Sequence, residues 1–539
     1  MKDLSKNLRY CIVLLILWPI ITTMTSGCLK HVSPSSGMGS PHGRVSAPSG
    51  DRSGSGVSSV LLLAQAQFEK GEGEENNSVP GSAKLTLVRK TKDGWKSSLL
   101  EDPESNVFHK ALWFTPPEGA GDTGILTIAG NAARLKLWHS DAGNTDTEDT
   151  HAGDMEAGSM EAGDGKTTTG AMGTTGAMAK AGKWKGTALW SPSFGGEQNR
   201  LRDIEVGDVT GDGVLDLVIA THDQGIVAVL QWKAGVWEVT ELDRTPETFV
   251  HEIEIADVNR DGRQEFFATP SAPNRLDGTP QPGRIVMYRF DEEHFIRSTV
   301  EEFPDRHVKE ILAADVSGSG CPDLFAAIEG EMAMVLGQPT LLDTVKIKQY
   351  RFIGDKVSGD KASGDKALRD NVSGGQTSEG LSSGGTFSGK VIADLPDMLC
   401  RNLTAGDVDG DGSIDIVAST MQSGIFILRQ KRAGEKKQPR EKHQEEKHPE
   451  DQPKEQQEAS ATAGEWEKTL IDADSSGFEH ATLIADLDHD GLCEIYVASD
   501  DQHVLRRYQW NGQTFQRDDL VPLQLDDITF CVTLCPSHP

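Results

Sequence analysis

Short apolar runs alternate with polar turns through most of the chain beyond residue 80. Five of these runs directly follow an acidic loop, and they begin at Asp216, Glu265, Asp323, Asp415 and Glu494. Runs of this length, rich in β-branched and aromatic residues and bounded by Gly and Asp turns, predict β-strands. No long segment shows helical periodicity, so the pattern predicts an all-β fold.

Two repeats recur along this part of the chain. The first is a turn followed by an aromatic residue, and it occurs at Trp95, Trp184, Trp237, Phe295, Phe387, Trp466 and Phe515. The second is an acidic loop between two apolar runs, within residues 204–220, 253–268, 311–327, 403–418 and 482–498. Without the low-complexity inserts between them the period is roughly 45–60 residues, which suits one four-stranded blade of a β-propeller.

The repeats predict a single β-propeller over residues 81–535, with seven four-stranded blades by the aromatic count and six or eight as alternatives. Segment 83–88 has the pattern of an outer strand of a blade, but the inner strands of that blade do not precede it. Segment 515–534 has the aromatic residue of the repeat, but the outer strands of a blade do not follow it. We expect the two chain ends to share one blade, which removes an exposed sheet edge. Segment 106–138 fills a blade position but has no acidic loop.

Three inserts interrupt the repeats, at about 141–182, 354–386 and 431–463. They contain too few apolar residues to form a core, so we expect them to be disordered loops.

The first thirty residues are typical of a targeting signal. Three basic residues precede an apolar run at 11–21, which has the length of a signal-peptide core and is short for a membrane span. The run leads to Thr25-Ser26-Gly27-Cys28, and small residues before a cysteine resemble the bacterial lipobox, in which that cysteine is lipidated. We therefore expect a lipoprotein-type signal peptide over 1–27, lipidation at Cys28 and a flexible Ser/Gly/Pro-rich tether over 28–80.

Ordinary secretion, with Cys28 unmodified, is the alternative. Either route places the mature chain outside the cytoplasm. Lipidation would hold it on the cell envelope of a bacterial membrane through the N-terminal lipid alone.

The net charge of the chain limits the kinds of partner that it is expected to bind. Acidic residues number 83 and basic residues 53, a net charge of −30, which repels phosphate backbones and argues against nucleic-acid binding. There is no CxxC motif, so zinc and thiol-redox functions have little support. Cys531 and Cys535 are close enough in sequence to form a disulfide, but nothing further in the sequence argues that they do.

The acidic loops have the spacing of a cation site. The best copies are Asp407-x-Asp409-x-Asp411-Gly412-x-x-Asp415 and the corresponding loop from Asp486 to Glu494. Oxygen ligands at positions 1, 3, 5 and 9, with Gly at position 6 for the turn, suit the flexible coordination of Ca²⁺ better than that of Mg²⁺. The predicted ligands are Asp208, Thr210, Asp212, Asp216, Asp257, Asn259, Asp261, Glu265, Asp407, Asp409, Asp411, Asp415, Asp486, Asp488, Asp490 and Glu494.

The loops have two alternative interpretations. An EF-hand needs a bidentate Glu at position 12, where this chain has apolar residues (Ile219, Ala268, Ala418 and Val497). An acidic turn without metal is the other alternative. The loop that begins at Asp315 has serines at positions 3 and 5, so its ligand set is thin and metal binding there is in doubt.

These loops and their flanks resemble the FG-GAP/VCBS-type repeats of integrin-α-like β-propellers, over roughly residues 84–535 apart from the inserts. The resemblance implies structural calcium at the loops that begin at Asp208, Asp257, Asp407 and Asp486. It is specific for fold and calcium but not for activity, because such propellers serve adhesion, scaffolding and polysaccharide processing.

A basic residue lies six positions before the first Asp of every acidic loop. The five residues are Arg202, His251, Lys309, Arg401 and His480, and His109 occupies the same place in the first blade. Because equivalent positions recur around a propeller axis, these residues could form a ring near the mouth of the central channel and attract an anionic ligand such as a uronate. Alternatively, each basic group neutralises the acidic loop of its own blade.

Two classes of function follow. The first is a calcium-binding propeller displayed on the cell envelope, which acts as an adhesion or scaffold module toward an extracytoplasmic protein or an acidic polysaccharide and needs no catalytic group. The second is a lyase-like enzyme acting on an acidic polysaccharide, with His251 or His480 as base and Arg202, Arg401 or Lys309 holding the substrate.

Overall fold

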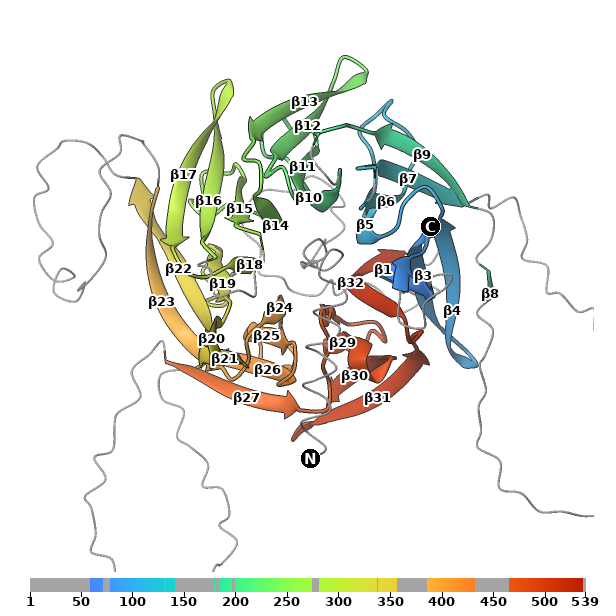
Figure 1. Cartoon of the computed structure of the whole chain (residues 1–539), viewed down its shortest axis with the longest axis vertical. Helices are drawn as coiled ribbons and strands as arrows, with labels where there is room; N and C mark the ends of the chain where they lie inside the picture. The colour runs from blue at the N-terminus through green and yellow to red at the C-terminus, as the bar shows by residue number, and fades with distance from the viewer. Residues whose placement is uncertain are drawn as a thin grey trace, which may run out of the picture.

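The computed structural model describes residues 59–70, 78–130, 132–140, 179–180, 184–195, 199–273, 281–336, 338–355, 385–431 and 465–536. Within these ranges the secondary structure is β-strand apart from one 3₁₀ turn, η1 (Asp500–Gln502). Apart from one two-stranded hairpin, the described strands form seven sheets arranged radially around an axis (Figure 1). The described part of the chain is therefore a seven-bladed β-propeller, as the repeats predict.

Each blade is an antiparallel sheet of four strands that runs outward from the axis. The innermost strands are β5 (Phe108–Phe114), β10 (Leu201–Gly207), β14 (Phe249–Ala256), β18 (Val308–Ala314), β24 (Cys400–Gly406), β28 (Thr482–Ala485) and β32 (Asp527–Pro536). The second strands are β1 (Ser59–Lys70), β6 (Gly124–Ala129), β11 (Asp216–Thr221), β15 (Glu265–Ser271), β19 (Asp323–Ile328), β25 (Asp415–Thr420) and β29 (Glu494–Ser499).

The two outer strands complete each blade. The third strands are β3 (Ala83–Thr91), β7 (Leu135–Ser140), β12 (Val227–Lys233), β16 (Gly283–Asp291), β22 (Val345–Asp355), β26 (Ile425–Gln430) and β30 (Val504–Trp510). The outermost strands are β4 (Gly94–Asp102), β9 (Trp184–Trp190), β13 (Val236–Asp243), β17 (His294–Phe303), β23 (Gly385–Leu395), β27 (Trp466–Asp472) and β31 (Phe515–Pro522).

Burial follows this radial order. Every residue of β6, β11, β19, β25 and β29 is buried, because a second strand has a partner on each side and neighbouring blades on both faces. The outermost strands are largely exposed, as in β13, where no residue is buried. This explains why the apolar runs after the acidic loops are continuous rather than alternating.

The seventh blade joins both ends of the chain. β32 is its innermost strand and pairs with β1, and β3 and β4 follow outward. The expectation that the chain ends share a blade is correct, but two details are wrong. Residues 59–70, assigned to the tether, form β1, whose residues 60–64 are almost wholly buried between β32 and β3. Segment 515–522 is β31, the last strand of the preceding blade, so only β32 crosses to the seventh.

The seven aromatic residues of the repeat all lie at the start of an outermost strand. Several of them reach the neighbouring blade. The ring of Trp95 packs edge-on against Tyr496, and that of Trp466 packs edge-on against Phe325, with centroids 6.2 and 5.7 Å apart. The aromatic repeat therefore counts blades because one copy begins each outermost strand, and copies such as Trp95 and Trp466 fill a junction between two blades.

Hydrogen bonds between innermost strands link three successive pairs of blades. Carboxylates accept from backbone N–H groups of the next blade: Asp203 from Ile253, Glu254 from Ala313 and Glu310 from Leu403, at 2.6, 2.8 and 2.9 Å. One further link is ionic, because the buried Lys110 of β5 donates to Asp203 and Glu205 of β10 at 2.7 and 2.6 Å. These contacts fix the relative positions of the blades close to the axis.

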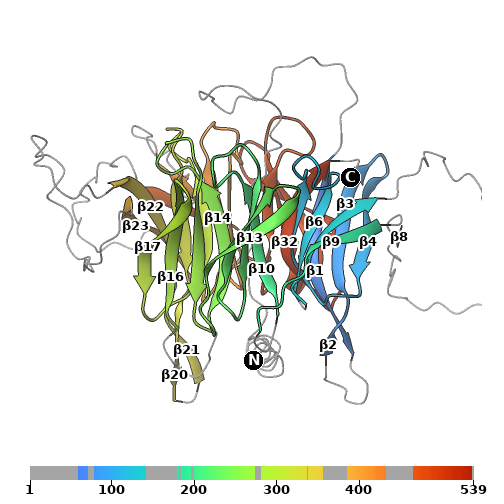
Figure 2. The ribbon, with the colours of Figure 1, turned by 90° about the horizontal axis from the view of Figure 1, so that it is seen from above.

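A few strands extend beyond the blades. β20 (Glu331–Val335) and β21 (Gln338–Asp343) form a hairpin between β19 and β22, and β2 (Ser78–Pro80) pairs with the end of β1. Both project from the same edge of the ring (Figure 2). The short β8 (Ala179–Lys180) pairs with β4.

Two further expectations concern other parts of the chain. The signal peptide, Cys28 and most of the three predicted inserts lie outside the described residues. Among the described residues there is no helix of the length and hydropathy that a membrane span requires. Cys535 has a free thiol, so it forms no disulfide with Cys531.

Candidate functional site

The five acidic loops occupy equivalent places, each joining the innermost strand of a blade to the second strand. Their backbones share one conformation. The glycine at position 6 has a φ between 80° and 93° in all five loops, in the left-handed region that favours glycine. Position 4 is also left-handed, including the non-glycine residues Arg260 and His489, with φ of 62° and 60°.

The first aspartate organises each turn from within. Its Oδ2 accepts a hydrogen bond from the N–H of the glycine at position 6, at 2.9 Å in the Asp208 loop and 2.8 Å in the Asp407 loop. The same bond occurs in the loops at Asp257, Asp315 and Asp486. The other oxygen, Oδ1, also accepts hydrogen bonds from the loop in Asp208, Asp257 and Asp315, whereas in Asp407 and Asp486 it has no hydrogen-bond partner and is left for a ligand.

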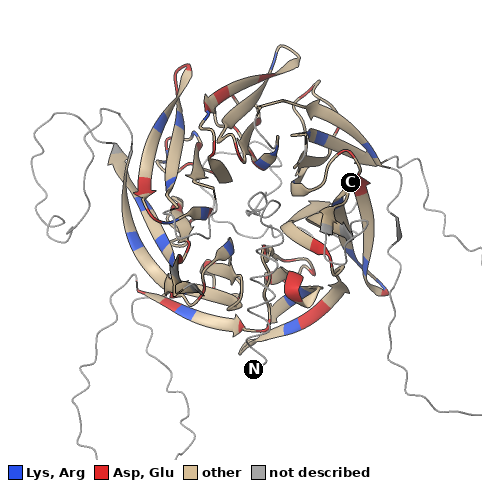
Figure 3. Cartoon of the chain, in the orientation of Figure 1, with Lys and Arg blue, Asp and Glu red and all other residues tan. Residues whose placement is uncertain are grey.

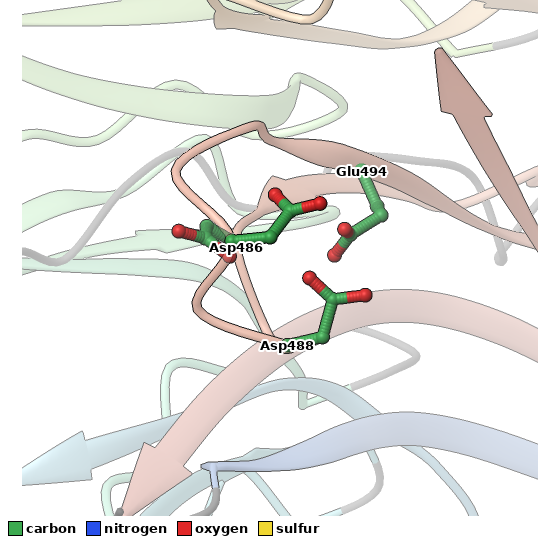
Figure 4. Close-up of side chains that lie close together, drawn as sticks. Asp486, Asp488 and Glu494 are labelled. Carbon is green, nitrogen blue, oxygen red and sulfur yellow. The ribbon is translucent and has the colours of Figure 1, made fainter. Parts of the chain in front are cut away.

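Four carboxylates converge in the Asp486 loop (Figure 4). One oxygen each from Asp486, Asp488, Asp490 and Glu494 lie within 4.8 Å of one another. Oδ1 of Asp486 and Oδ1 of Asp488 are buried without a hydrogen-bond partner. Clustered negative charges with unpaired buried oxygens are unfavourable unless a cation lies between them, and an all-oxygen donor set suits Ca²⁺. These residues fit the ion that the family implies.

Three carboxylates converge in the Asp407 loop. Oxygens of Asp407, Asp409 and Asp411 lie within 4.8 Å of one another, and Oδ1 of Asp407 is buried without a hydrogen-bond partner. The fourth predicted ligand, Asp415, is instead paired with Arg429, whose Nε lies 3.1 Å from its Oδ1. Burial raises the pKa of Asp415 to about 6, against the opposing effect of Arg429. This loop fits a cation with a smaller ligand set.

The loops at Asp208 and Asp257 do not bring three acidic ligands together in the described structure. In each, the neutral residue at position 3 donates to the carboxylate at position 9: Thr210 Oγ1 to Asp216 at 3.1 Å, and Asn259 Nδ2 to Glu265 at 2.6 Å. Burial raises the pKa of Asp216 to about 6 and that of Glu265 to about 7. Metal binding at these two loops therefore stays a prediction.

The Asp315 loop, expected to be weak, is held by hydrogen bonds and by an arginine. The hydroxyl of Ser317 donates to Asp315 at 3.0 Å. Asp323, at position 9, accepts two bonds from Arg351, from Nε at 3.0 Å and from an Nη at 2.8 Å. A side-chain cation thus balances the charge that a metal would balance elsewhere.

The basic position of the repeat coincides with an irregularity in the sheet. The pairing of β5, β10, β18 and β24 with their second strands each skips one residue, and the skipped residues are His109, Arg202, Lys309 and Arg401. The pairing of β14 is irregular between Val250 and Ile253, on either side of His251. A bulge breaks the alternation of side chains and re-aims the extra one. All six basic side chains, including His480, are buried.

Three of these side chains belong to a mixed cluster, here called the axial cluster and formed by Arg202, Lys309, Glu329, Arg401 and Glu479. Glu329 Oε1 lies 3.0 Å from Arg401 and 3.2 Å from Lys309. Burial acts to raise the pKa of Glu329, but Lys309 and Arg401 hold it well below its usual range. Figure 3 shows how basic and acidic residues are distributed over inner and outer strands alike.

The charged groups of two side chains in the axial cluster make no hydrogen bonds. Neither oxygen of Glu479 and none of the three guanidinium nitrogens of Arg202 has a hydrogen-bond partner, although both residues are buried. Arg202 lies over the ring of Phe530, with 5.7 Å between the guanidinium carbon and the ring centroid. Burial raises the pKa of Glu479 to about 7, with Arg401 and Arg202 acting in the opposite direction. Burial also lowers the pKa of Lys309 to about 7.

The axial cluster is remote from the acidic loops. Arg202 is the second residue of β10, whereas the acidic loop follows its last residue, so the two lie roughly 20 Å apart along the strand. Lys309 and Arg401 pair with Glu329 rather than with an acidic loop. The hypothesis that each basic group neutralises the loop of its own blade is therefore wrong for these residues.

The contacts of His480 and His251 lie within the fold. His480 is bonded at both ring nitrogens, to the carbonyl oxygen of Thr420 at 2.8 Å and to the hydroxyl of Ser475 at 3.0 Å. Burial lowers its pKa to about 4. His251 packs edge-on against His222 and Phe249. A general base needs a nitrogen available to substrate, and His480 offers none.

Sequence reasoning missed four residues that shape these sites: Glu329, Arg429, Glu479 and Gln509. Glu329 follows β19 and Glu479 precedes His480, so both adjoin elements that the repeat identifies. Gln509 donates to Asp488 Oδ2 and Glu494 Oε1 at 3.0 and 3.3 Å. The only sequence signal for Glu479 was its position beside the basic residue of the repeat.

Comparisons with known proteins agree with this architecture. The FG-GAP-like repeat family matches residues 208–268, which contain the two acidic loops that begin at Asp208 and Asp257, strands β11 to β14 and the start of β15. The chain is therefore a seven-bladed β-propeller that contains an FG-GAP-like repeat. No curated protein matches the sequence significantly.

Two solved structures are similar at low identity. One is a protein from Bacteroides uniformis proposed to be a 6-phosphogluconolactonase (10% identity, TM-score 0.44, covering 89% of this chain and 100% of that chain). The other is a rhamnogalacturonan lyase from Bacillus licheniformis (10% identity, TM-score 0.26, covering 87% of this chain and 78% of that chain). Similarity at this level carries no information about activity.

Proposed function

We propose that this chain is a calcium-stabilised β-propeller that serves as a binding or scaffold module on the cell envelope. The single observation that carries the calcium part is the Asp486 loop, where four acidic side chains meet and two buried carboxylate oxygens lack a partner. Calcium would be held there by Asp486, Asp488, Asp490 and Glu494, and in the Asp407 loop by Asp407, Asp409 and Asp411. In both places the ion neutralises the turn and tightens the hairpin between two strands.

Thermal unfolding of the chelated full-length chain tests this. Adding Ca²⁺ should raise the unfolding temperature, since a ligand that binds only the folded state stabilises it. The Asp486→Asn variant should lose part of that rise, whereas Asp315→Asn, in the loop with a thin ligand set, should keep it. An unfolding curve that is indifferent to Ca²⁺ in the unaltered chain would contradict the proposal.

The ligand of the module is proposed to be anionic and to engage the axial cluster. The support is Arg202, a buried guanidinium without any hydrogen bond, in a group that also contains Lys309 and Arg401. A carboxylate supplies the paired acceptors that a guanidinium prefers. An acidic polysaccharide and an acidic protein segment both carry this group.

Binding of oligogalacturonate and of an acidic peptide, each measured by calorimetry, separates these two sources. Arg202→Met should weaken the binding of whichever probe is the ligand, whereas Arg244→Met, at an exposed arginine paired with Glu241, should not. Circular dichroism verifies that both variants fold. Equal affinity of the unaltered chain and Arg202→Met would remove the axial cluster from the proposal.

Display on the envelope rests on the lipobox-like segment that ends at Cys28. In a bacterial host, labelling with a palmitate analogue should mark the unaltered chain, and Cys28→Ser should abolish the label and release the protein from the membrane fraction. A lyase activity is not proposed, because both nitrogens of the candidate base His480 are bonded within the fold and the other candidate, His251, is fully buried.

A further inference from the structure

The residue opposite the position-9 carboxylate differs among the blades. The second and third strands pair directly, and continuing their register by one residue places the position-9 acid opposite a third-strand residue. These opposite residues are Gln231, Arg289, Arg351, Arg429 and Gln509. The position thus holds a neutral amide in two blades and a permanent cation in three.

The loops at Asp407 and Asp486 form a matched pair. Both have acids at positions 1, 3, 5 and 9 and glycine at position 6, but Arg429 faces the first loop and Gln509 faces the second. Their clusters differ accordingly: the position-9 acid joins the others in the Asp486 loop and is absent from the group in the Asp407 loop.

The contacts of Arg429 account for this difference. Its Nε lies 3.1 Å from Asp415 Oδ1, and an Nη lies 2.8 Å from Asp409 Oδ2, so one guanidinium engages two of the four acids. It also lies over the ring of Trp510, which fixes its position. Gln509 reaches the corresponding acids Asp488 and Glu494 with a neutral amide and brings no charge. The guanidinium of Arg507 lies 3.6 Å from Asp488 Oδ2, but its shorter ion pair, at 2.6 Å, is with Asp518 outside the loop.

A guanidinium and a divalent cation compete for the same carboxylate oxygens. Where arginine has already neutralised two acids, an incoming ion gains less electrostatic energy and must also displace or tolerate the fixed positive charge. The Asp315 loop extends the trend, because Arg351 binds Asp323 through two bonds and serines replace the acids at positions 3 and 5.

We propose that the third-strand residue opposite the position-9 acid sets the calcium affinity of each fully acidic loop, with Gln509 permitting a tight site and Arg429 acting as a built-in counterion that weakens one. This rests on the proposed calcium binding. It makes the Asp486 loop the high-affinity site and the Asp407 loop the low-affinity site.

Exchanging the two residues tests the proposal in the full-length, chelated chain. Ca²⁺ titration by calorimetry would be done in two backgrounds, Asp486→Asn to leave the Asp407 loop and Asp407→Asn to leave the Asp486 loop. Arg429→Gln should tighten binding at the Asp407 loop by about tenfold or more, the scale of removing one adjacent charge. Gln509→Arg should weaken the Asp486 loop to a similar extent, and Arg429→Lys, which keeps a charge, should stay close to the unaltered affinity.

The outcomes separate this proposal from the broader one. If Ca²⁺ binds both loops but Arg429→Gln and Gln509→Arg each leave the dissociation constant within threefold, the counterion role is overturned and calcium binding stands. If Ca²⁺ binds neither loop in the unaltered chain, calcium binding itself fails. Should Arg429→Gln not fold, because its contact with Trp510 is lost, Gln509→Arg still decides the question.

Discussion

The innermost strands carry charge at both ends, and the two ends manage it in different ways. At one end, the acidic loops gather charges of a single sign on partly exposed turns, and the Asp486 loop leaves buried oxygens unpaired. At the other, the axial cluster mixes both signs in a buried setting, where Glu329 is shared by Lys309 and Arg401. In the proposed function an external cation completes the first arrangement, whereas in the second Lys309 and Arg401 balance Glu329 from within the chain.

The largest effect is expected from breaking an internally balanced group near the axis. Lys110→Met removes the cation between Asp203 and Glu205 and leaves two buried carboxylates unpaired. Breaking a buried ion pair in this way costs about 3–5 kcal/mol of unfolding free energy. Urea unfolding should give this loss with and without Ca²⁺. A loss that Ca²⁺ restores would contradict the separation of the two ends.

The second-largest effect is expected to be a pH dependence of stability caused by Glu479. Because burial raises its pKa from 4.5 to about 7, the folded state favours the protonated form. Its contribution to stability is therefore complete below pH 4.5 and is lost as the pH rises through 7. The unfolding free energy lost between pH 4.5 and 7 is on the order of 3 kcal/mol, at about 1.4 kcal/mol for each pKa unit.

The Glu479→Gln variant isolates this contribution. Its unfolding free energy, compared with that of the unaltered chain, should rise between pH 4.5 and 7 and stay constant beyond. A difference that does not vary with pH across this window would show that the raised pKa of Glu479 does not affect folding.

The loop end should respond to metal alone. Asp486→Asn should have little effect in chelator. At a Ca²⁺ concentration of about 100 times the dissociation constant, it should lose about 2–3 kcal/mol of stabilisation relative to the unaltered chain. Chemical unfolding at two fixed Ca²⁺ concentrations measures this. An equal loss in chelator would mean that Asp486 acts through its bond to Gly491 rather than through an ion.

The smallest effect should come from Arg351→Gln in the Asp315 loop. The arginine side chain is 57% exposed, so its ion pair with Asp323 is screened by solvent and contributes less than about 1 kcal/mol. The loss should be the same with and without Ca²⁺. A variant that gains Ca²⁺-dependent stability would mean that this loop, too, is limited by its arginine.

Much of the fold could be predicted because its signals are local and repeated. The aromatic at the start of each outermost strand, such as Trp237, gave the blade count, and the acidic loops gave the turn between the first two strands. β1 was missed because its apolar run is short and continues into alanines and polar residues beside Ser- and Gly-rich sequence. Its burial comes from β32, more than 450 residues later, which no local pattern reports.

The candidate sites were predicted less completely, because partners arise from pairing rather than spacing. Asp415 and Arg429 are separated by 14 residues, but Asp323 and Arg351 by 28, since the hairpins between them differ in length. The bulges that place Arg202 and Arg401 leave no mark in the sequence beyond the basic residue itself. Glu479 and Glu329 precede or follow strands, where a periodic pattern assigns no role.

The seventh blade bears on how the protein is made. A ribosome releases β1, β3 and β4 long before β32, so the inner edge of β1 lacks its neighbour until β32 has been synthesised. An unpaired edge of apolar residues is a template for unwanted association. In the nascent chain, the ring of blades therefore cannot close until the ten residues of β32 have paired with β1.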